Sequence, residues 1–111
     1  MKFKDKMVGD IGVLSLKGKL LGYPETDELN DEVRSFLGSG TTKIVIDMGG
    51  LSWLSSMGVG ALMRSYTTVT NNGGKLKLAR MTDKARGLFT MTQLIKVFEI
   101  YETVEEAVES F

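Results

Sequence analysis

Hydrophobic and polar positions at the start of the chain predict two short strands. Phe3, Met7 and Val8 mark the first strand, and residues 11–17 alternate apolar and polar side chains as a half-buried second strand does. Gly9-Asp10 lies between them, and such pairs are typical of tight hairpin turns. We therefore predict an N-terminal hairpin whose first strand lies at the edge of a sheet.

Apolar residues then recur at helical spacing. The positions are Leu29, Val33, Phe36 and Leu37, which fall at i, i+4, i+7 and i+8. Pro24 and the acidic residues of 25–28 suit a first helical turn, and the glycines of 38–40 suit a helix end. The pattern predicts one amphipathic helix that ends near Gly38.

Residues 43–48 are almost continuously apolar and rich in β-branched side chains, which is typical of a strand buried on both faces. This segment is predicted to be the central strand. Residues 49–56 are predicted to form a turn, and residues 57–70 a second helix. The helix has an apolar stripe of Val59, Leu62, Met63, Tyr66 and Val69.

The rest of the chain continues the alternation of strands and helices. Residues 75–79 alternate as a strand, 85–91 form a third helix after a Thr82-Asp83 cap, and 97–101 form a last strand. Thr103 and Glu106 have the spacing of a capping box that opens a short terminal helix. We predict one α/β domain over residues 1–111, with a mostly parallel sheet of four to five strands, the edge hairpin and about four helices.

Composition excludes several classes of function. The chain of 111 residues has no cysteine and no histidine, so disulfides, thiolate nucleophiles, Cys or His metal sites and Ser-His-Asp triads are absent. Fourteen basic and fourteen acidic residues cancel, which gives no electrostatic reason to expect nucleic acid or an anionic membrane as a partner. No segment resembles a signal peptide or a membrane span. We expect a cytoplasmic protein with a protein partner and without metal or cofactor.

One loop stands out, because ligands and partners bind near the carboxyl ends of strands in open α/β sheets. Ser55 and Ser56 follow the central strand, and Gly58 and Gly60 follow them. One of these serines could cap the next helix while the glycines allow close packing. A serine here could equally be an exposed phosphoacceptor, where phosphate meets the positive end of the helix dipole. Spacing alone leaves both interpretations open.

Longer motifs carry a family resemblance. IVIDMGGLSWLSSMGVGALM, followed by NNGGKLKLARMTDKARGLFTMTQLIKVFEIYETVEEAV, resembles the STAS domain of bacterial anti-sigma factor antagonists over essentially the whole chain. The resemblance implies that Ser56 is phosphorylated by a partner serine kinase that is itself the anti-sigma factor. It also implies that unphosphorylated protein binds this kinase and frees a sigma factor. A separate metal-dependent serine phosphatase would restore the unphosphorylated form.

The resemblance implies a phosphorylation site at Ser56, with Ser55 as the second choice, and a partner-binding surface. That surface comprises Leu21, Tyr23, Trp53, Ser55, Ser56, Met57, Gly58 and Val59. Three positions depart from the family pattern. Ser55 and Leu21 stand where acidic residues are usual, and Met57 stands where a hydroxyl residue is usual.

Two other functions stay open. The first is a STAS adaptor that is never phosphorylated, or a scaffold subunit of a larger assembly. The second is an enzyme with Ser55 or Ser56 as nucleophile and Asp47 or Lys43 as helper, although no spacing singles out a base. We expect no enzyme activity. We expect a monomer or weak dimer, because the exposed first strand allows edge pairing.

Overall fold

The computed structural model describes all residues from Met1 to Phe111 and contains one five-stranded sheet. The elements in chain order are β1 (Lys2–Val8), β2 (Ile11–Leu20), α1 (Glu25–Gly38), β3 (Lys43–Leu54), α2 (Ser56–Asn71), β4 (Lys75–Ala79), α3 (Asp83–Met91), the 3-10 turn η1 (Leu94–Lys96), β5 (Ile100–Tyr101) and α4 (Val104–Glu109). The strand order is β1-β2-β3-β4-β5, so β3 is central and β1 lies at an edge. β1 is antiparallel to β2 and all other pairs are parallel, as predicted.

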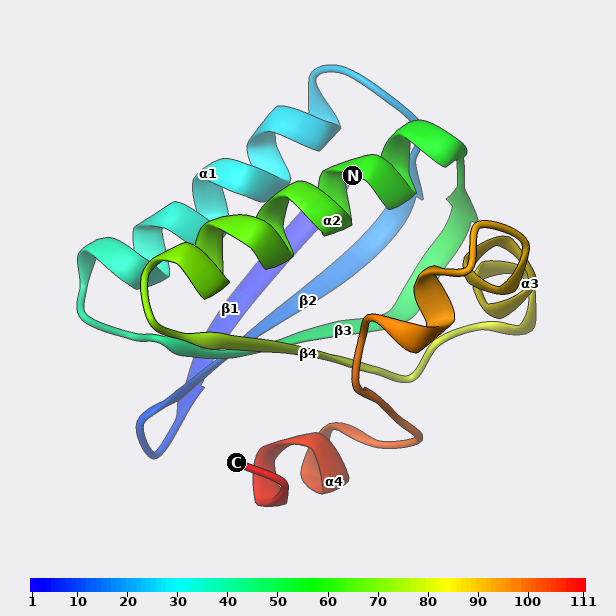
Figure 1. Cartoon of the computed structure of the whole chain (residues 1–111). Coiled ribbons are helices and arrows are strands. Elements are labelled where there is room, and N and C mark those ends of the chain that lie inside the picture. The colour runs from blue at the N-terminus through cyan, green and yellow to red at the C-terminus, as the bar shows by residue number, and fades with distance from the viewer.

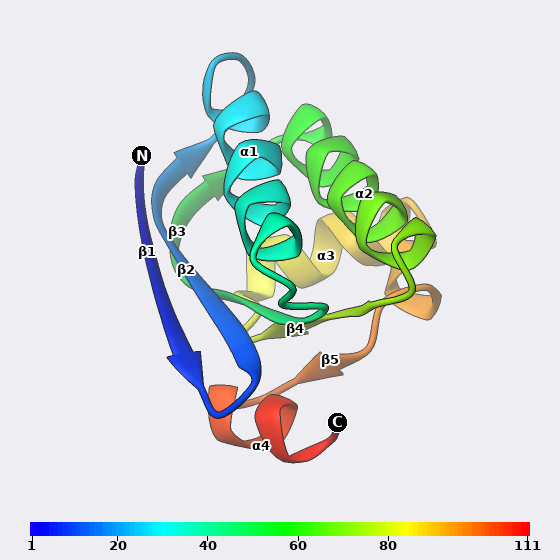
Figure 2. The same ribbon diagram turned by 90° about the vertical axis from the view of Figure 1, so that its left-hand side faces the viewer.

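The helices are divided unequally between the two faces of the sheet. α1 and α2 lie side by side over one face, with α3 at its end, whereas α4 lies alone on the opposite face (Figures 1 and 2). The larger core lies under α1, α2 and α3 and includes Leu14, Ile46 and Leu62, all fully buried. The smaller core lies under α4 and includes Val13 and Val45. Alternate residues of β2 and β3 therefore serve two separate cores.

Helix caps follow the predicted positions. The Thr82 hydroxyl accepts a hydrogen bond from the Ala85 amide at 3.2 Å, and the Thr103 hydroxyl accepts one from the Glu106 amide at 3.1 Å. Both bonds satisfy amides that have no partner within their helix. The helices predicted from Thr82 and Thr103 are confirmed.

Two strands are longer than predicted. β3 continues through Gly49 and Gly50 to Leu54, where a turn was expected, and β2 continues past Gly18 to Leu20. The pairing shifts register at two points in this stretch. A Cβ on Gly50 would lie 2.5 Å from the Leu16 carbonyl oxygen, so the glycine permits a bulged close approach. The glycine pair therefore bends the strand without ending it.

The last strand is shorter than predicted. Gln93 adopts a left-handed conformation with φ of 62° and opens η1, so Val97 and Phe98 lie outside β5. Phe98 is buried and packs edge-to-face on Tyr66 and Phe89, with ring centroids 5.1 and 5.4 Å away. Packing in the core, rather than strand pairing, accounts for the apolar character of Phe98, whereas Val97 is exposed.

The terminal helix is held by a buried lysine. The Lys77 ammonium donates hydrogen bonds to the Ser110 carbonyl at 3.0 Å and to the Ser110 hydroxyl at 2.8 Å. It lies 3.6 Å from the Glu99 carboxylate and 4.4 Å from the centroid of the Phe111 ring. Lys77 therefore anchors the end of the chain to β4. None of the helices has the length and apolar composition needed to cross a membrane.

Candidate functional site

α2 begins at the end of the sheet where β2 and β3 finish (Figure 1). The Ser55 amide donates a hydrogen bond to the Leu20 carbonyl at 3.1 Å. A Cβ on Gly58 would lie 2.4 Å from the same carbonyl oxygen. The first turn of α2 can therefore rest directly on the end of β2 only because residue 58 has no side chain.

Ser55 is the N-cap of α2. Its hydroxyl accepts a hydrogen bond from the Gly58 amide at 3.1 Å and donates one to the Leu21 carbonyl at 2.6 Å. Ser56 is the first residue of the helix, and its side chain is exposed and makes no hydrogen bond within the chain. Of the two interpretations left open by spacing, the structure assigns the capping role to Ser55 and leaves the Ser56 hydroxyl free.

Exposed apolar side chains come from the two segments next to Ser56. They are Leu21, Tyr23, Trp53 and Met57, with exposed fractions of 46%, 78%, 52% and 62%. We call these four residues the apolar collar. Large exposed apolar side chains near one another are typical of surfaces that bind proteins. The predicted partner-binding residues of this group thus lie at one edge of the molecule.

Two residues predicted to contact a partner are buried. Gly58 is covered by the end of β2, and Val59 is only 2% exposed, because it belongs to the larger core. Neither residue can offer a side chain to another protein. Their place in the site is to position the first turn of α2, which corrects the predicted surface.

Lys84 also belongs to the candidate site, although no sequence pattern indicated it. Its ammonium from α3 lies over the Trp53 ring, 4.3 Å from the ring centroid, in a cation–π arrangement. Residues 53 and 84 are brought together only by the packing of α3 beside the end of β3. Local spacing therefore contains no signal for this contact.

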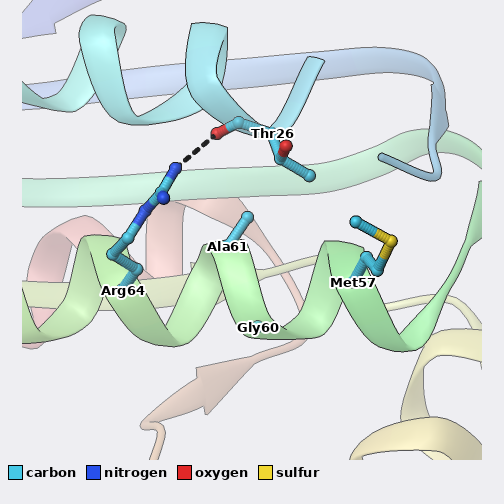
Figure 3. A pocket seen from close by; sticks show the side chains of 5 residues that line it. All are labelled: Thr26, Met57, Gly60, Ala61 and Arg64. Carbon is cyan, nitrogen blue, oxygen red and sulfur yellow. Dashed lines mark hydrogen bonds between the residues drawn. The ribbon is translucent and has the colours of Figure 1, made fainter. Parts of the chain in front are cut away.

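A shallow pocket of about 240 Å³ lies between the first turn of α1 and the first half of α2 (Figure 3). Met57 and Arg64 lie at its two ends on α2, and Ala61 lies between them. The Arg64 guanidinium donates to the Thr26 carbonyl at 3.4 Å and to the Asp27 carboxylate at 2.9 Å. Residues 57, 61 and 64 have helical i, i+4, i+7 spacing, so the sequence contained the signal for this face.

The candidate helpers of a serine nucleophile are engaged elsewhere. The Asp47 carboxylate accepts hydrogen bonds from the Arg80 guanidinium at 3.1 Å, the Gly49 amide at 3.0 Å and the Ser15 hydroxyl at 3.4 Å. Lys43 forms an ion pair with Asp10 at 3.1 Å. The structure therefore brings neither helper into contact with Ser55 or Ser56. It also contains no cluster of three carboxylates that could hold a metal ion.

The electrostatics of the helix start favour a negative group. The first turn of α2 contains no acidic residue, so the positive end of its dipole is not compensated by a carboxylate of its own. A phosphate on the Ser56 hydroxyl would lie at this helix end and beside the apolar collar. The arrangement can accept phosphorylation without losing the cap, since the cap belongs to Ser55.

Comparison with known proteins identifies the family and the fold. Residues 3–107 match the family model described as the STAS domain. A protein of Thermotoga maritima that is named as a candidate anti-sigma factor antagonist is 26% identical over 74 residues, which are 67% of this chain and 66% of that protein. The matched segment thus spans just under two thirds of that relative.

Solved structures show the same architecture. The crystal structure of a candidate anti-sigma factor antagonist from Thermotoga maritima aligns with a TM-score of 0.86 and 25% identity, covering 97% of this chain and 92% of the other. The Bacillus cell fate determinant SpoIIAA in its phosphorylated form aligns with a TM-score of 0.76 and 22% identity, covering 98% of both chains. The resemblance in the sequence motifs and the predicted α/β fold are both confirmed.

Proposed function

Because this chain belongs to the STAS domain family, we propose that it is an anti-sigma factor antagonist whose binding to its partner is switched by phosphate on Ser56. The observation that carries this proposal is the division of roles between two adjacent serines. Ser55 holds the helix cap, whereas Ser56 presents a free hydroxyl at the same helix end. The names of similar proteins as anti-sigma factor antagonists support the class of partner.

In the unphosphorylated form, the apolar collar and the exposed start of α2 bind a kinase-type anti-sigma factor. Aromatic side chains such as Trp53 and Tyr23 contribute strongly to protein interfaces when a partner desolvates them. Lys84 covers part of the Trp53 ring and orients the indole before the partner arrives. Sequestering the anti-sigma factor releases the sigma factor, and this chain catalyses no step itself.

In the phosphorylated form, Ser56 carries a charge of about −2 at pH 7. Phosphate is strongly hydrated, so burying it against an apolar partner surface requires desolvation that no basic residue of the first turn offsets. The phosphate therefore favours the free form over the complex. Removal of the phosphate by a metal-dependent serine phosphatase restores binding.

The experiment that tests this proposal compares Ser56→Ala with Ser56→Asp in titration calorimetry against the cognate kinase. We expect Ser56→Ala to bind as the unmodified chain does and Ser56→Asp to bind at least about tenfold more weakly, since a buried unpaired charge costs more than 1.4 kcal/mol. Ser35→Asp on α1 is the matched control, because Ser35 is also an exposed serine on a helix. Equal binding by the two Ser56 variants would refute the switch.

Tandem mass spectrometry of protein from its native host locates the modification. Phosphate on Ser56 supports the proposal, whereas phosphate on Ser55 would place the charge on the residue that caps α2. If the chain binds the kinase but carries no phosphate under any growth condition, the result would support the alternative hypothesis of a STAS adaptor that is never phosphorylated. That hypothesis rests on Ser55 and Leu21, which occupy positions where acidic residues are usual in the family.

A further inference from the structure

The sheet face that carries α4 has the shape of a step. α4 covers the amino-terminal halves of β2 and β3 by packing on Ile11, Val13 and Val45. Beyond the helix, the same face is bare and contains a hollow of about 520 Å³ over β1, β2 and β3. Gly50 lines this hollow and has no side chain to fill it, so the hollow is deeper at this position. The half of this face that carries α4 is therefore raised (Figures 1 and 2), and the half that contains the hollow is recessed.

The recessed half is positively charged. Lys2, Lys4 and Lys17 line the hollow, and none of them forms an ion pair within the chain. Lys2 lies directly opposite Lys17 in the β1–β2 ladder, and like charges in such positions destabilise a sheet. Arg80 and Asp47 also line the hollow but neutralise each other. Three lysine charges are left uncompensated.

The raised half is negatively charged. Residues 99–111 contain five glutamates and no basic residue. Glu105, Glu106 and Glu109 on α4 are exposed, and none of them forms an ion pair within the chain. The raised half of this face is therefore acidic and the recessed half is basic, although the whole chain has a formal net charge of zero.

We propose that this stepped face binds a second copy of the same chain. A surface with one raised acidic half and one recessed basic half is complementary to its own image turned by 180° about a two-fold axis. In that arrangement α4 of each copy enters the hollow of the other, and the unpaired lysines meet the unpaired glutamates in both directions. Relief of the repulsion between Lys2 and Lys17 adds to the attraction.

The dimensions of the molecule are sufficient for such a dimer. A standard specific interface buries about 800 Å² on each partner, a modest share of this chain's 6044 Å². The molecule measures 32 × 28 × 23 Å, so one broad face can supply that area. The proposed dimer leaves the switch accessible, because α2 lies on the opposite face of the sheet (Figure 1). The dimer proposal is thus independent of phosphorylation at Ser56.

Sedimentation velocity of the full chain over a range of concentrations up to about 1 mM tests the dimer. We expect association at low ionic strength, with an affinity that falls on the order of tenfold or more when salt is raised well beyond 0.1 M, since the paired charges lie at a solvated interface. A monomer at every concentration in low salt would overturn the proposal. A dimer that salt does not affect would also overturn it.

Charge reversal identifies the two contacting surfaces. The helix variant carries Glu105→Lys and Glu109→Lys, and it spares Glu106 because that residue contacts the Thr103 cap. The strand variant carries Lys2→Glu, Lys4→Glu and Lys17→Glu. We expect each variant alone to be monomeric and an equimolar mixture of the two to form a heterodimer, in which both contacts again join opposite charges.

The matched control is Glu28→Lys with Asp31→Lys on α1, which makes the same change in net charge on the other face of the sheet. This control is expected to keep the dimer at low salt. Loss of the dimer in the control, or failure of the mixture to associate, would contradict a two-fold contact between α4 and the hollow. Binding of a polyglutamate peptide by a chain that remains monomeric would assign the hollow to a foreign acidic segment and overturn the proposal.

Discussion

The neighbouring hydroxyl groups of Ser55 and Ser56 have different structural roles. The Ser55 hydroxyl is both acceptor and donor, joining the α2 amide end to the carbonyl of Leu21. The Ser56 hydroxyl, one residue later, is exposed and bonded to nothing in the chain. Spacing could place a serine at this helix end but could not decide which one caps, since a shift of one residue separates the two arrangements.

Substitution of the two serines by alanine separates these roles. We expect Ser55→Ala to lower the free energy of unfolding by about 1 to 2 kcal/mol, because it removes an N-cap and leaves the Leu21 carbonyl without its donor. Ser56→Ala should change it by less than about 0.5 kcal/mol, as at other exposed positions. Urea denaturation measures both, and equal losses would show that Ser56 shares the cap.

The glycines of α2 provide a second matched pair. Gly58→Ala should destabilise the chain by about 1 to 3 kcal/mol, because the new Cβ would lie 2.4 Å from the Leu20 carbonyl oxygen. A Cβ on Gly60 would meet nothing within 4 Å, so Gly60→Ala should stabilise the helix by up to about 1 kcal/mol. Thermal unfolding of the two variants checks the opposite signs. The sequence shows two similar glycines, and only packing distinguishes them.

Asp10 gives a prediction about pH. A hydrogen bond and charge attraction from Lys43 hold the pKa of Asp10 below its ordinary value of 3.8. Since the folded-state pKa is lowered, the contribution of this pair to stability is complete above pH 3.8 and is lost as the pH falls through the folded-state value. Carbon-13 titration of the carboxyl group should show the low pKa, and Lys43→Ala should raise it. An unchanged pKa in that variant would contradict the pairing as its cause.

Among the elements, helices were predicted more accurately than strands. The spacing of apolar residues located α1, α2 and α3 to within two residues, because each buries a stripe against the same core. The extension of β3 was missed, since Gly49 and Gly50 have the composition of a turn and only their contact with β2 shows a bulge. The left-handed residues Arg80 and Gln93 were also missed, because neither is a glycine.

The attachment of α4 combines apolar packing on the sheet with the contacts of Lys77. Lys77→Ala removes two hydrogen bonds to Ser110 and the contact with Phe111. We expect the free energy of unfolding to fall by about 1 to 3 kcal/mol and amide exchange in α4 to accelerate, with exchange in the central strand much less affected. Hydrogen exchange measured by mass spectrometry resolves the two regions. Equal acceleration in both would show that α4 unfolds only with the whole chain.

For the whole molecule, the count of charges concealed their distribution. Equal numbers of acidic and basic residues gave no reason to expect nucleic acid or an anionic membrane as a partner. The fold nevertheless gathers three unpaired lysines in one hollow and three unpaired glutamates on one helix. Strand register and the return of α4 to the open face create this separation. The fold class was predictable from the sequence, whereas the charge pattern needed the three-dimensional arrangement.

The switch is expected to act through local charge and not through a change of fold. Because Ser56 is exposed and bonded to no other residue, Ser56→Asp should leave the melting temperature within about 2 °C of the unmodified chain, in line with other surface substitutions. Backbone NMR shifts should change only near the start of α2 and the loop after β2. Shift changes throughout β4 and α4 would instead indicate a conformational switch.

The fixed position of Ser56 in the folded domain affects how a kinase can recognise this residue. The residue lies in the first turn of a helix whose start is tied to two carbonyls of a distant strand and loop, so its neighbours in space are set by the fold. A peptide copied from residues 50–61 would keep the order of the amino acids but lose the Leu21 carbonyl that holds Ser55 and the Lys84 side chain that lies over Trp53. A kinase that acts on Ser56 must therefore read the shape of the folded domain, and the peptide should be a poor substrate for it.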